Sequence, residues 1–171
     1  MNHLIRASVD DDPYADLMLI KIENHLHKFD EVIKSTKNTI MGLQQDLIED
    51  DVYIQKMESK RPIELCLNCG SLYALQLSRL IMQFDALIRL MMPMRHFGAI
   101  TEAQWLLMLK NLTEHHRSMT NIAVNYPFYK FDREIAKDPE HLMTIKLKKR
   151  FGELPHDILT GNIKPHKFNQ R

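Results

Sequence analysis

A long heptad pattern in the first third of the chain constrains its fold more than any other feature. Apolar residues recur at alternating steps of four and three from Ile22 to Leu47. This spacing places them on one stripe of an α-helix, where they can pack against other helices. Asp12 and Pro13 supply an N-cap and a first helical residue just before the pattern. The sequence therefore predicts a long amphipathic helix that begins at Pro13. It either continues to about Glu49, protruding to meet a partner, or bends near Lys34 to Asn38.

The helical pattern returns twice later in the chain. Residues 73–91 repeat the steps of four and three until Pro93, which is expected to end the second helix. Thr101 is the predicted N-cap of a third helix, whose apolar seam covers residues 105–123. Three helices with matching stripes and short connections predict a bundle-like core.

The segment from Arg61 to Asn68 has a different period, typical of a half-buried β-strand. Its two faces are Ile63, Leu65 and Leu67 on one side, and Glu64, Cys66 and Asn68 on the other. A lone strand leaves its backbone groups unpaired, so we expect it to pair with its copy in a homodimer. The chain has only 5 glycines and 7 prolines, which disfavours a many-stranded fold. The predicted fold is mainly α, with one short strand that pairs across a homodimer.

Length and charge predict one domain with an uneven charge distribution. The chain has 171 residues, the size of a single domain. Residues 1–58 form an acidic helical segment with 6 Lys and Arg against 12 Asp and Glu, although the net charge of the whole chain is +1. Residues 59–126 form the predicted strand-helix-helix element, and residues 127–171 a basic C-terminal segment. Such asymmetry favours an anionic partner for the later part of the chain or head-to-tail self-association, although solvated faces explain most charge runs.

Two short helices are predicted in the basic C-terminal segment. The first begins at Asp138 and Pro139 and is capped by Gly152. The second follows Pro155 and ends at Gly161.

The motifs of common enzyme classes are missing from the sequence. It contains no phosphate-binding glycine loop, dinucleotide fingerprint, zinc-protease motif or serine nucleophile elbow, so we expect no catalysis and no cofactor. Cys66 and Cys69 have the spacing of half a zinc site, but no second pair follows, and we interpret them as structural cysteines without a metal. The absence of a long apolar run and of a signal peptide predicts a cytoplasmic protein with no membrane partner.

Basic and polar residues form a candidate interface with double-stranded DNA. Paired strands from two chains can enter the major groove, and clustered cations can neutralise phosphates. A solvated helix end explains the basic cluster equally well. In the DNA hypothesis, bases are contacted by Glu64, Cys66 and Asn68, and phosphates by Lys60, Arg61, Thr101, Lys146, Lys148, Lys149 and Arg150.

Three stretches carry a family resemblance that covers nearly the whole chain. They are DDPYAD at residues 11–16, GSLY through RHFG at residues 70–98, and GELPHDILTG at residues 152–161. In order and spacing they resemble the AcaB-like family of transcriptional regulators from conjugative plasmids and integrating conjugative elements. The resemblance implies an activator of conjugative transfer genes that binds promoter DNA as a dimer through a ribbon-helix-helix-like element with long helical extensions. RNA polymerase is a further candidate partner.

A second function stays open from the sequence. The chain could be a non-enzymatic helical protein-protein interaction factor of the conjugation machinery. Its contact surface would be the seam of residues 22–47 or the methionine-rich second helix. Salt-sensitive binding to duplex DNA separates the two functions, because the interaction factor should show none.

Overall fold

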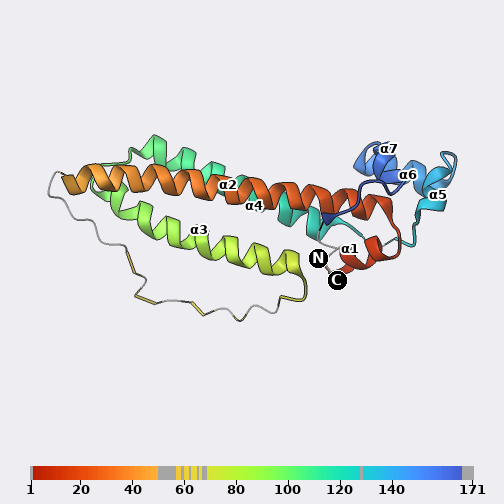
Figure 1. Cartoon of the computed structure of the whole chain (residues 1–171), viewed down its shortest axis with the longest axis horizontal. Coiled ribbons are helices and arrows are strands. Elements are labelled where there is room, and N and C mark those ends of the chain that lie inside the picture. The colour runs from red at the N-terminus through yellow and green to blue at the C-terminus, as the bar shows by residue number, and fades with distance from the viewer. Residues whose placement is uncertain are drawn as a thin grey trace. The chain divides into compact units, whose positions relative to one another are not determined.

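The computed structural model confirms a mainly helical fold. It describes residues 2–49, 57–58, 60–61, 63–64, 66, 69–127 and 129–166. Over these ranges the chain forms seven helices and no strand (Figure 1). The helices are α1 (Asn2–Val9), α2 (Pro13–Glu49), α3 (Leu72–His96), α4 (Glu102–Asn125), α5 (Arg133–Lys137), α6 (Leu142–Phe151) and α7 (His156–Leu159).

Helix α2 has the predicted limits and the predicted cap. It begins at Pro13, and a side-chain oxygen of Asp12 accepts hydrogen bonds from the backbone N–H groups of Tyr14 (2.9 Å) and Ala15 (3.2 Å). These bonds satisfy two of the amides that a helix leaves unpaired at its start. The short helix α1 was not predicted; it buries Leu4 and Ala7.

The chain divides into two compact units that share α2, α4 and, at its first two residues, α3. The first unit contains Met1–His25, Gly70–Tyr73 and Ser118–Arg171, and the second contains Leu26–Cys69 and Ala74–Arg117. Each unit is described by itself below. The organisation as a single domain stays a prediction.

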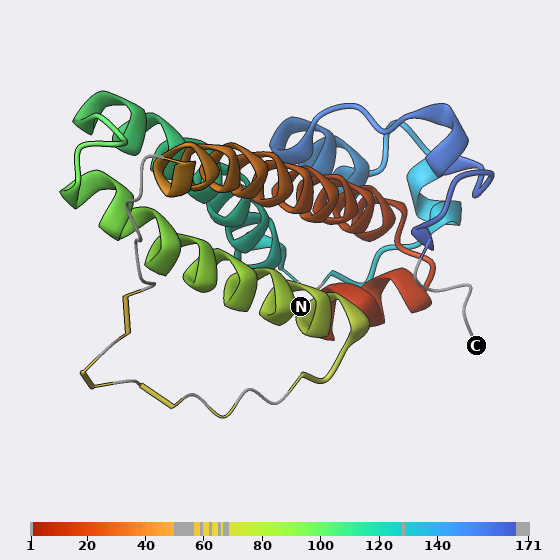
Figure 2. The same ribbon diagram turned by 60° about the vertical axis from the view of Figure 1, so that its left-hand side comes forward.

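The second unit is built from three helical segments with apolar seams. Its parts of α2 and α3 run in the same direction, and α4 returns in the opposite one (Figures 1 and 2). The predicted seams supply its core, because Phe29, Ile33, Leu87 and Leu112 are all buried. The centre of the Phe29 ring lies 6.1 Å from that of Phe84 and 6.2 Å from that of the half-buried His116.

The prediction that Pro93 ends the second helix is wrong. Helix α3 continues through Pro93 to His96. Proline has no N–H, so the carbonyl of Arg89, four residues earlier, loses its helical partner. The backbone N–H of Met57 donates to that carbonyl at 3.2 Å. A segment outside the helix therefore supplies the missing bond.

The predicted strand at residues 61–68 is not confirmed. Ile63, Glu64 and Cys66 have irregular backbone, while Pro62, Leu65, Leu67 and Asn68 lie outside the described residues. The model contains one chain, and the strand was expected to pair with a second. The paired ribbon of a homodimer therefore stays a prediction.

The C-terminal helices of the first unit are partly as predicted. Helix α6 begins at Leu142 and not at Asp138, because the His141 imidazole Nδ1 is the group that accepts from the backbone N–H of Met143 (3.2 Å). Its predicted cap is confirmed: Gly152 has a φ of 89°, and its N–H donates to the Lys148 carbonyl at 2.9 Å. Helix α7 follows Pro155 as expected. Helix α5 was not predicted, and it contacts both α6 and α7.

Candidate nucleic-acid interface

The four predicted cations of α6 lie together on exposed positions of one short helix. Lys148, Lys149 and Arg150 occupy its last turn, Lys146 is its fifth residue of ten, and all four are exposed. Helix α6 belongs to the first unit. Cations at a helix C-terminus are also favoured by the helix dipole, which helps to explain why this position tolerates so much like charge.

The opposite face of α6 anchors the helix in the first unit. Leu147 is fully buried, and the Thr144 hydroxyl donates to the Ile135 carbonyl of α5 at 3.0 Å. The Phe151 ring lies 6.1 Å from the Tyr14 ring and 5.4 Å from the Tyr126 ring. The exposed cations therefore belong to a helix whose opposite face is packed into the first unit.

The four cations differ in how far they are already paired. Lys148 forms an ion pair with Glu153 at 2.6 Å. Arg150 donates to the Asn125 carbonyl (3.1 Å) and the Tyr129 hydroxyl (3.3 Å). Lys146 lies 5.8 Å from the centre of the Tyr129 ring. Within the described part of the chain, the Lys149 side chain alone of the four has no hydrogen bond, ion pair or ring contact, so its ammonium group is the most available to a ligand.

A largely buried polar cluster centred on Arg133 of α5 also lies in the first unit. The Arg133 guanidinium pairs with Asp11 and Asp16, and its Nε donates to the Ile158 carbonyl at 3.3 Å. Ser8 also donates to Asp16. Burial raises the pKa of Asp16, and the hydrogen bonds from Ser8 and Arg133 oppose that rise. No local sequence pattern signals this role of Arg133, because its two carboxylate partners are more than 100 residues away.

The cap of α2 belongs to the same cluster. The Tyr126 hydroxyl donates to the second carboxylate oxygen of Asp12, which is fully buried. Burial raises the pKa of Asp12 to about 6, although hydrogen bonds from Tyr126 and from two backbone amides oppose the rise. The sequence predicted the capping role of Asp12 but not its burial or its aromatic partner.

A shallow hollow of about 350 Å³ lies beside Arg150. Met18, Ile122 and Phe151 give it an apolar floor, and Lys21 of α2 adds a second cation to its lining. Lys21 is a candidate contact that sequence reasoning missed, because it lies in the acidic half of the chain. Its nearness to Arg150 depends on the tertiary packing of the first unit.

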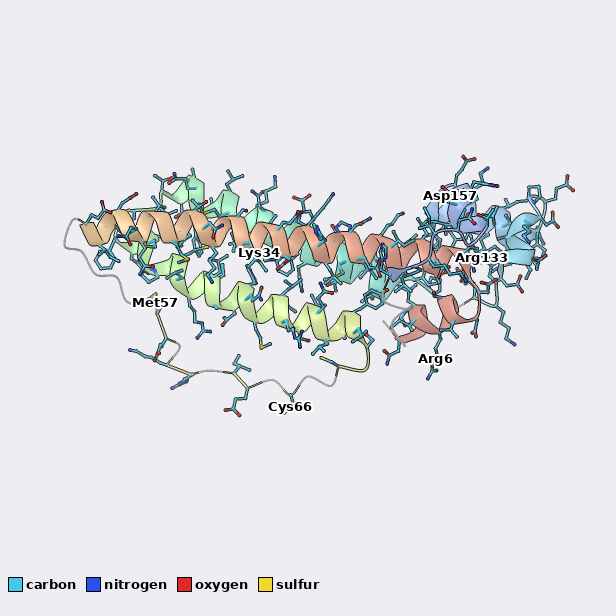
Figure 3. All side chains as sticks on the ribbon, viewed as in Figure 1. Arg6, Lys34, Met57, Cys66, Arg133 and Asp157 are labelled. Atoms are coloured by element: carbon cyan, nitrogen blue, oxygen red, sulfur yellow. The ribbon has the colours of Figure 1, made fainter. Side chains whose placement is uncertain are left out.

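The remaining predicted contact residues belong to the second unit. Lys60, Arg61, Glu64 and Cys66 are exposed in the segment between α2 and α3, where Figure 3 shows Cys66 directed away from the helices. Asn68 lies outside the described residues. The structure thus brings the α6 cations together and leaves the others in a separate unit.

Thr101 forms a reciprocal cap with Gln104. Its hydroxyl accepts from the Gln104 backbone N–H (3.3 Å), and its own N–H donates to the Gln104 side-chain oxygen (2.9 Å). The carboxylate of Glu102, next in sequence, pairs with Arg95 at 2.7 Å. The predicted N-cap is confirmed, and its amide is already engaged.

The cysteines show no assembled metal site. Cys66 is exposed, and the Cys69 sulfur lies 3.3 Å from the Ser78 hydroxyl oxygen. Across the described residues, no group of three or more His, Cys, Asp or Glu side chains converges as metal ligands would.

Comparison with known proteins gives the chain its family. The model of the family described as transcriptional regulator AcaB matches residues 1–170, and the chain belongs to this family. It is therefore a transcriptional regulator. No curated protein and no solved structure matches the chain. Among the helices of the described residues, none is both long and apolar enough to span a membrane.

Proposed function

We propose that this regulator binds promoter DNA as a homodimer and activates the conjugative transfer genes of a mobile element in the cytoplasm. The proposal rests on membership of the AcaB family and on one structural observation, the exposed basic face of α6. It acts through DNA binding and not through catalysis. RNA polymerase is a candidate partner, which the regulator would contact while it is bound to the promoter.

The α6 cations are the proposed phosphate contacts. A duplex carries regularly spaced negative charges, and each lysine or arginine that neutralises one releases a counterion. Lys146, Lys148, Lys149 and Arg150 offer this chemistry on an anchored helix. Lys21 joins them through the hollow that it shares with Arg150.

The segment before α3 supplies the proposed base contacts. Glu64, Cys66 and Asn68 would face base edges if two copies pair as an antiparallel ribbon, with Lys60 and Arg61 on flanking phosphates. Ile63 is 85% exposed in the single chain, and pairing across a homodimer would cover it. Thr101 has the weakest case as a phosphate contact, because its amide already binds Gln104.

A titration against DNA tests the proposal. Purified protein is titrated with labelled promoter-region DNA of its own element and with unrelated DNA at two salt concentrations, while its mass is measured. We expect specific, salt-sensitive binding by a dimer. The variant Lys149→Ala should weaken binding to both DNAs and reduce the slope of log K against log salt by about 1.

Matched variants show whether the effect belongs to the proposed surface. Lys28→Ala removes an exposed lysine of α2 and should leave both affinity and salt slope unchanged. Arg61→Ala should behave like Lys149→Ala, while Asn68→Ala should relax the preference for promoter DNA. If the wild-type protein binds neither DNA, DNA binding is rejected as its function.

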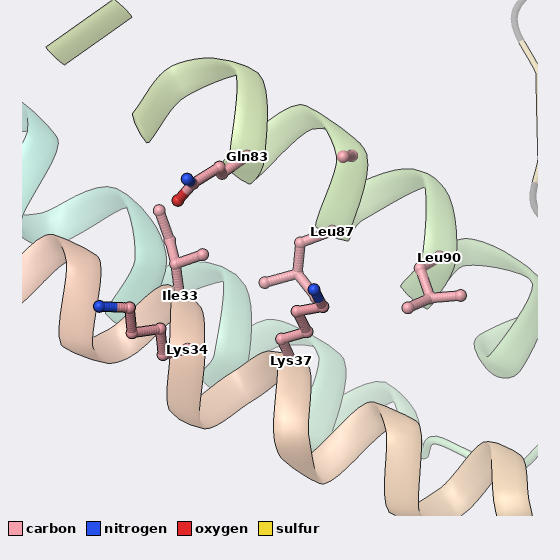
Figure 4. A pocket seen from close by; sticks show the side chains of 7 residues that line it. Ile33, Lys34, Lys37, Gln83, Leu87 and Leu90 are labelled. Carbon is pink, nitrogen blue, oxygen red and sulfur yellow. The ribbon is translucent and has the colours of Figure 1, made fainter. Parts of the chain in front are cut away.

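The rival function has one surface in its favour. In the second unit, a hollow of about 390 Å³ lies between α2 and α3, with Ile33, Leu87 and Leu90 in its wall and Lys34 and Lys37 beside them (Figure 4). It is a candidate contact site for a protein of the conjugation machinery. The seam of α2 is less available for this purpose, because its residues from Ile22 to Ile40 are buried.

A further inference from the structure

The outward face of α6 carries two apolar side chains among its cations. Leu142 is 83% exposed and Ile145 is 52% exposed. The two are three residues apart and therefore neighbours on the helix surface, and Lys146 and Lys149 continue the same face. The buried side of the helix, marked by Thr144 and Leu147, points the other way. An exposed aliphatic pair bordered by cations needs a ligand that is both apolar and anionic.

We propose that α6 enters the major groove of DNA and that Leu142 and Ile145 read thymine through its methyl group. The inference rests on the proposed DNA-binding function and adds specificity-determining residues to it. The major groove displays the thymine methyl to apolar side chains, and the phosphates lie along both of its edges. A duplex therefore matches the apolar centre and the basic border of this helix face.

The two halves of α6 suit different parts of the groove. In DNA-binding helices that enter the major groove, residues near the N-terminus contact base edges. Leu142 is the first residue of α6 and Ile145 the fourth, whereas the four cations lie between the fifth residue, Lys146, and the ninth, Arg150. Glu140, just before the helix, would repel phosphates. Base contact is therefore expected from the first four residues of α6 and phosphate contact from the cations that follow them.

Replacing thymine by deoxyuridine tests the methyl contact directly. A duplex library with a randomised centre is first used to select the sites preferred by wild-type protein and by Leu142→Ala. The variant should lose a thymine preference at one or two adjacent positions and keep the rest of the site. Deoxyuridine at those positions should weaken wild-type binding about fourfold for each methyl, and Leu142→Ala binding less than twofold.

The controls separate this inference from the proposed function. Val9→Ala truncates an aliphatic residue that is 66% exposed on α1, and it should retain full sensitivity to deoxyuridine. Circular dichroism checks that Val9→Ala, Leu142→Ala and Ile145→Ala each keep the helix content of the wild-type protein. If Leu142→Ala and Ile145→Ala keep every base preference, or weaken all sequences equally, the inference is overturned while DNA binding stands. If wild-type protein binds no duplex, the proposed function fails and the inference fails with it.

Discussion

Asp12 stabilises one helix as its N-cap, but the burial of its carboxylate charge lowers the stability of the protein. Its carboxylate caps α2 and accepts from the Tyr126 hydroxyl, but no cation among the described residues pairs with it. The neighbouring Asp16 has Arg133 as its partner. A buried charge that is satisfied only by neutral donors retains part of its desolvation penalty. The raised pKa of Asp12, about 6, reflects that penalty.

We expect Asp12→Asn to stabilise the protein at neutral pH. The pKa of Asp12 is raised from 3.8 to about 6 on folding, so the folded state holds the proton more tightly and stability falls as pH rises from about 4 to about 6. Asparagine caps helices as well as aspartate and removes the charge. The gain should be about 1–2 kcal/mol at pH 7, after the loss of a favourable dipole interaction.

Denaturant titrations at pH 4.5 and pH 7.5 check this expectation. The difference in unfolding free energy between Asp12→Asn and wild type should be large at the higher pH and small at the lower one. Asp10→Asn, at an exposed turn position, is the matched control and should show no such pH dependence. An Asp12→Asn variant that is equally destabilised at both pH values would show that the carboxylate charge is favourable there.

At the scale of elements, Pro93 is a case where local propensity does not decide the structure. Proline inside a helix costs about 3 kcal/mol, because it removes a hydrogen bond and crowds the preceding turn. Met94, one residue later, is fully buried, so continuing the helix places an apolar side chain in the core. The Met57 N–H restores a partner for the Arg89 carbonyl. Tertiary contacts thus offset the local penalty.

The variant Pro93→Ala tests whether tertiary contacts offset the local cost of proline. It restores a backbone N–H at position 93, and this N–H would compete with that of Met57 for the Arg89 carbonyl. We expect a stability gain of about 1 kcal/mol, smaller than the full propensity difference because buried contacts are lost. The Met57 amide should exchange with deuterium faster than in wild type. The control variant Pro139→Ala lies in an exposed turn and should leave the exchange rate of the Met57 amide unchanged. Slow exchange of that amide in both variants would mean that the hydrogen bond from Met57 to Arg89 does not depend on Pro93.

The spacing of apolar residues predicted the long helices, each of which buries one apolar face. The seams of α2, α3 and α4 followed from the spacing of apolar residues, and Gly152 was identified as a cap because it is a glycine at a helix end. Helices α1 and α5 are short, and their positions depend on packing and on Arg133. The four α6 cations were visible as a charge run, whereas Lys21 joins Arg150 only in the folded chain. Long-range partners leave no trace in a local pattern.

At the scale of the whole molecule, α2, α3 and α4 all connect the two units. Helix α2 contributes Pro13–His25 to the first unit and Leu26–Glu49 to the second, α3 crosses after Tyr73, and α4 crosses after Arg117. Helix formation is cooperative, because each added residue extends an existing hydrogen-bond ladder. These shared helices therefore favour coupled folding of the units over independent folding.

We expect urea to unfold the chain in a single transition. Trp105 is the only tryptophan and is buried in the second unit, with the Arg95 guanidinium 5.3 Å from the centre of its ring. Its fluorescence reports that unit, whereas far-UV circular dichroism reports all helices. For one cooperative domain the two curves coincide. Repeating the titration at two protein concentrations is the control for the proposed dimer, because dimer dissociation shifts the midpoint of both curves together. Fluorescence and dichroism midpoints that differ at each concentration would contradict the single transition, because they would show that one unit loses its structure while helix elsewhere in the chain persists.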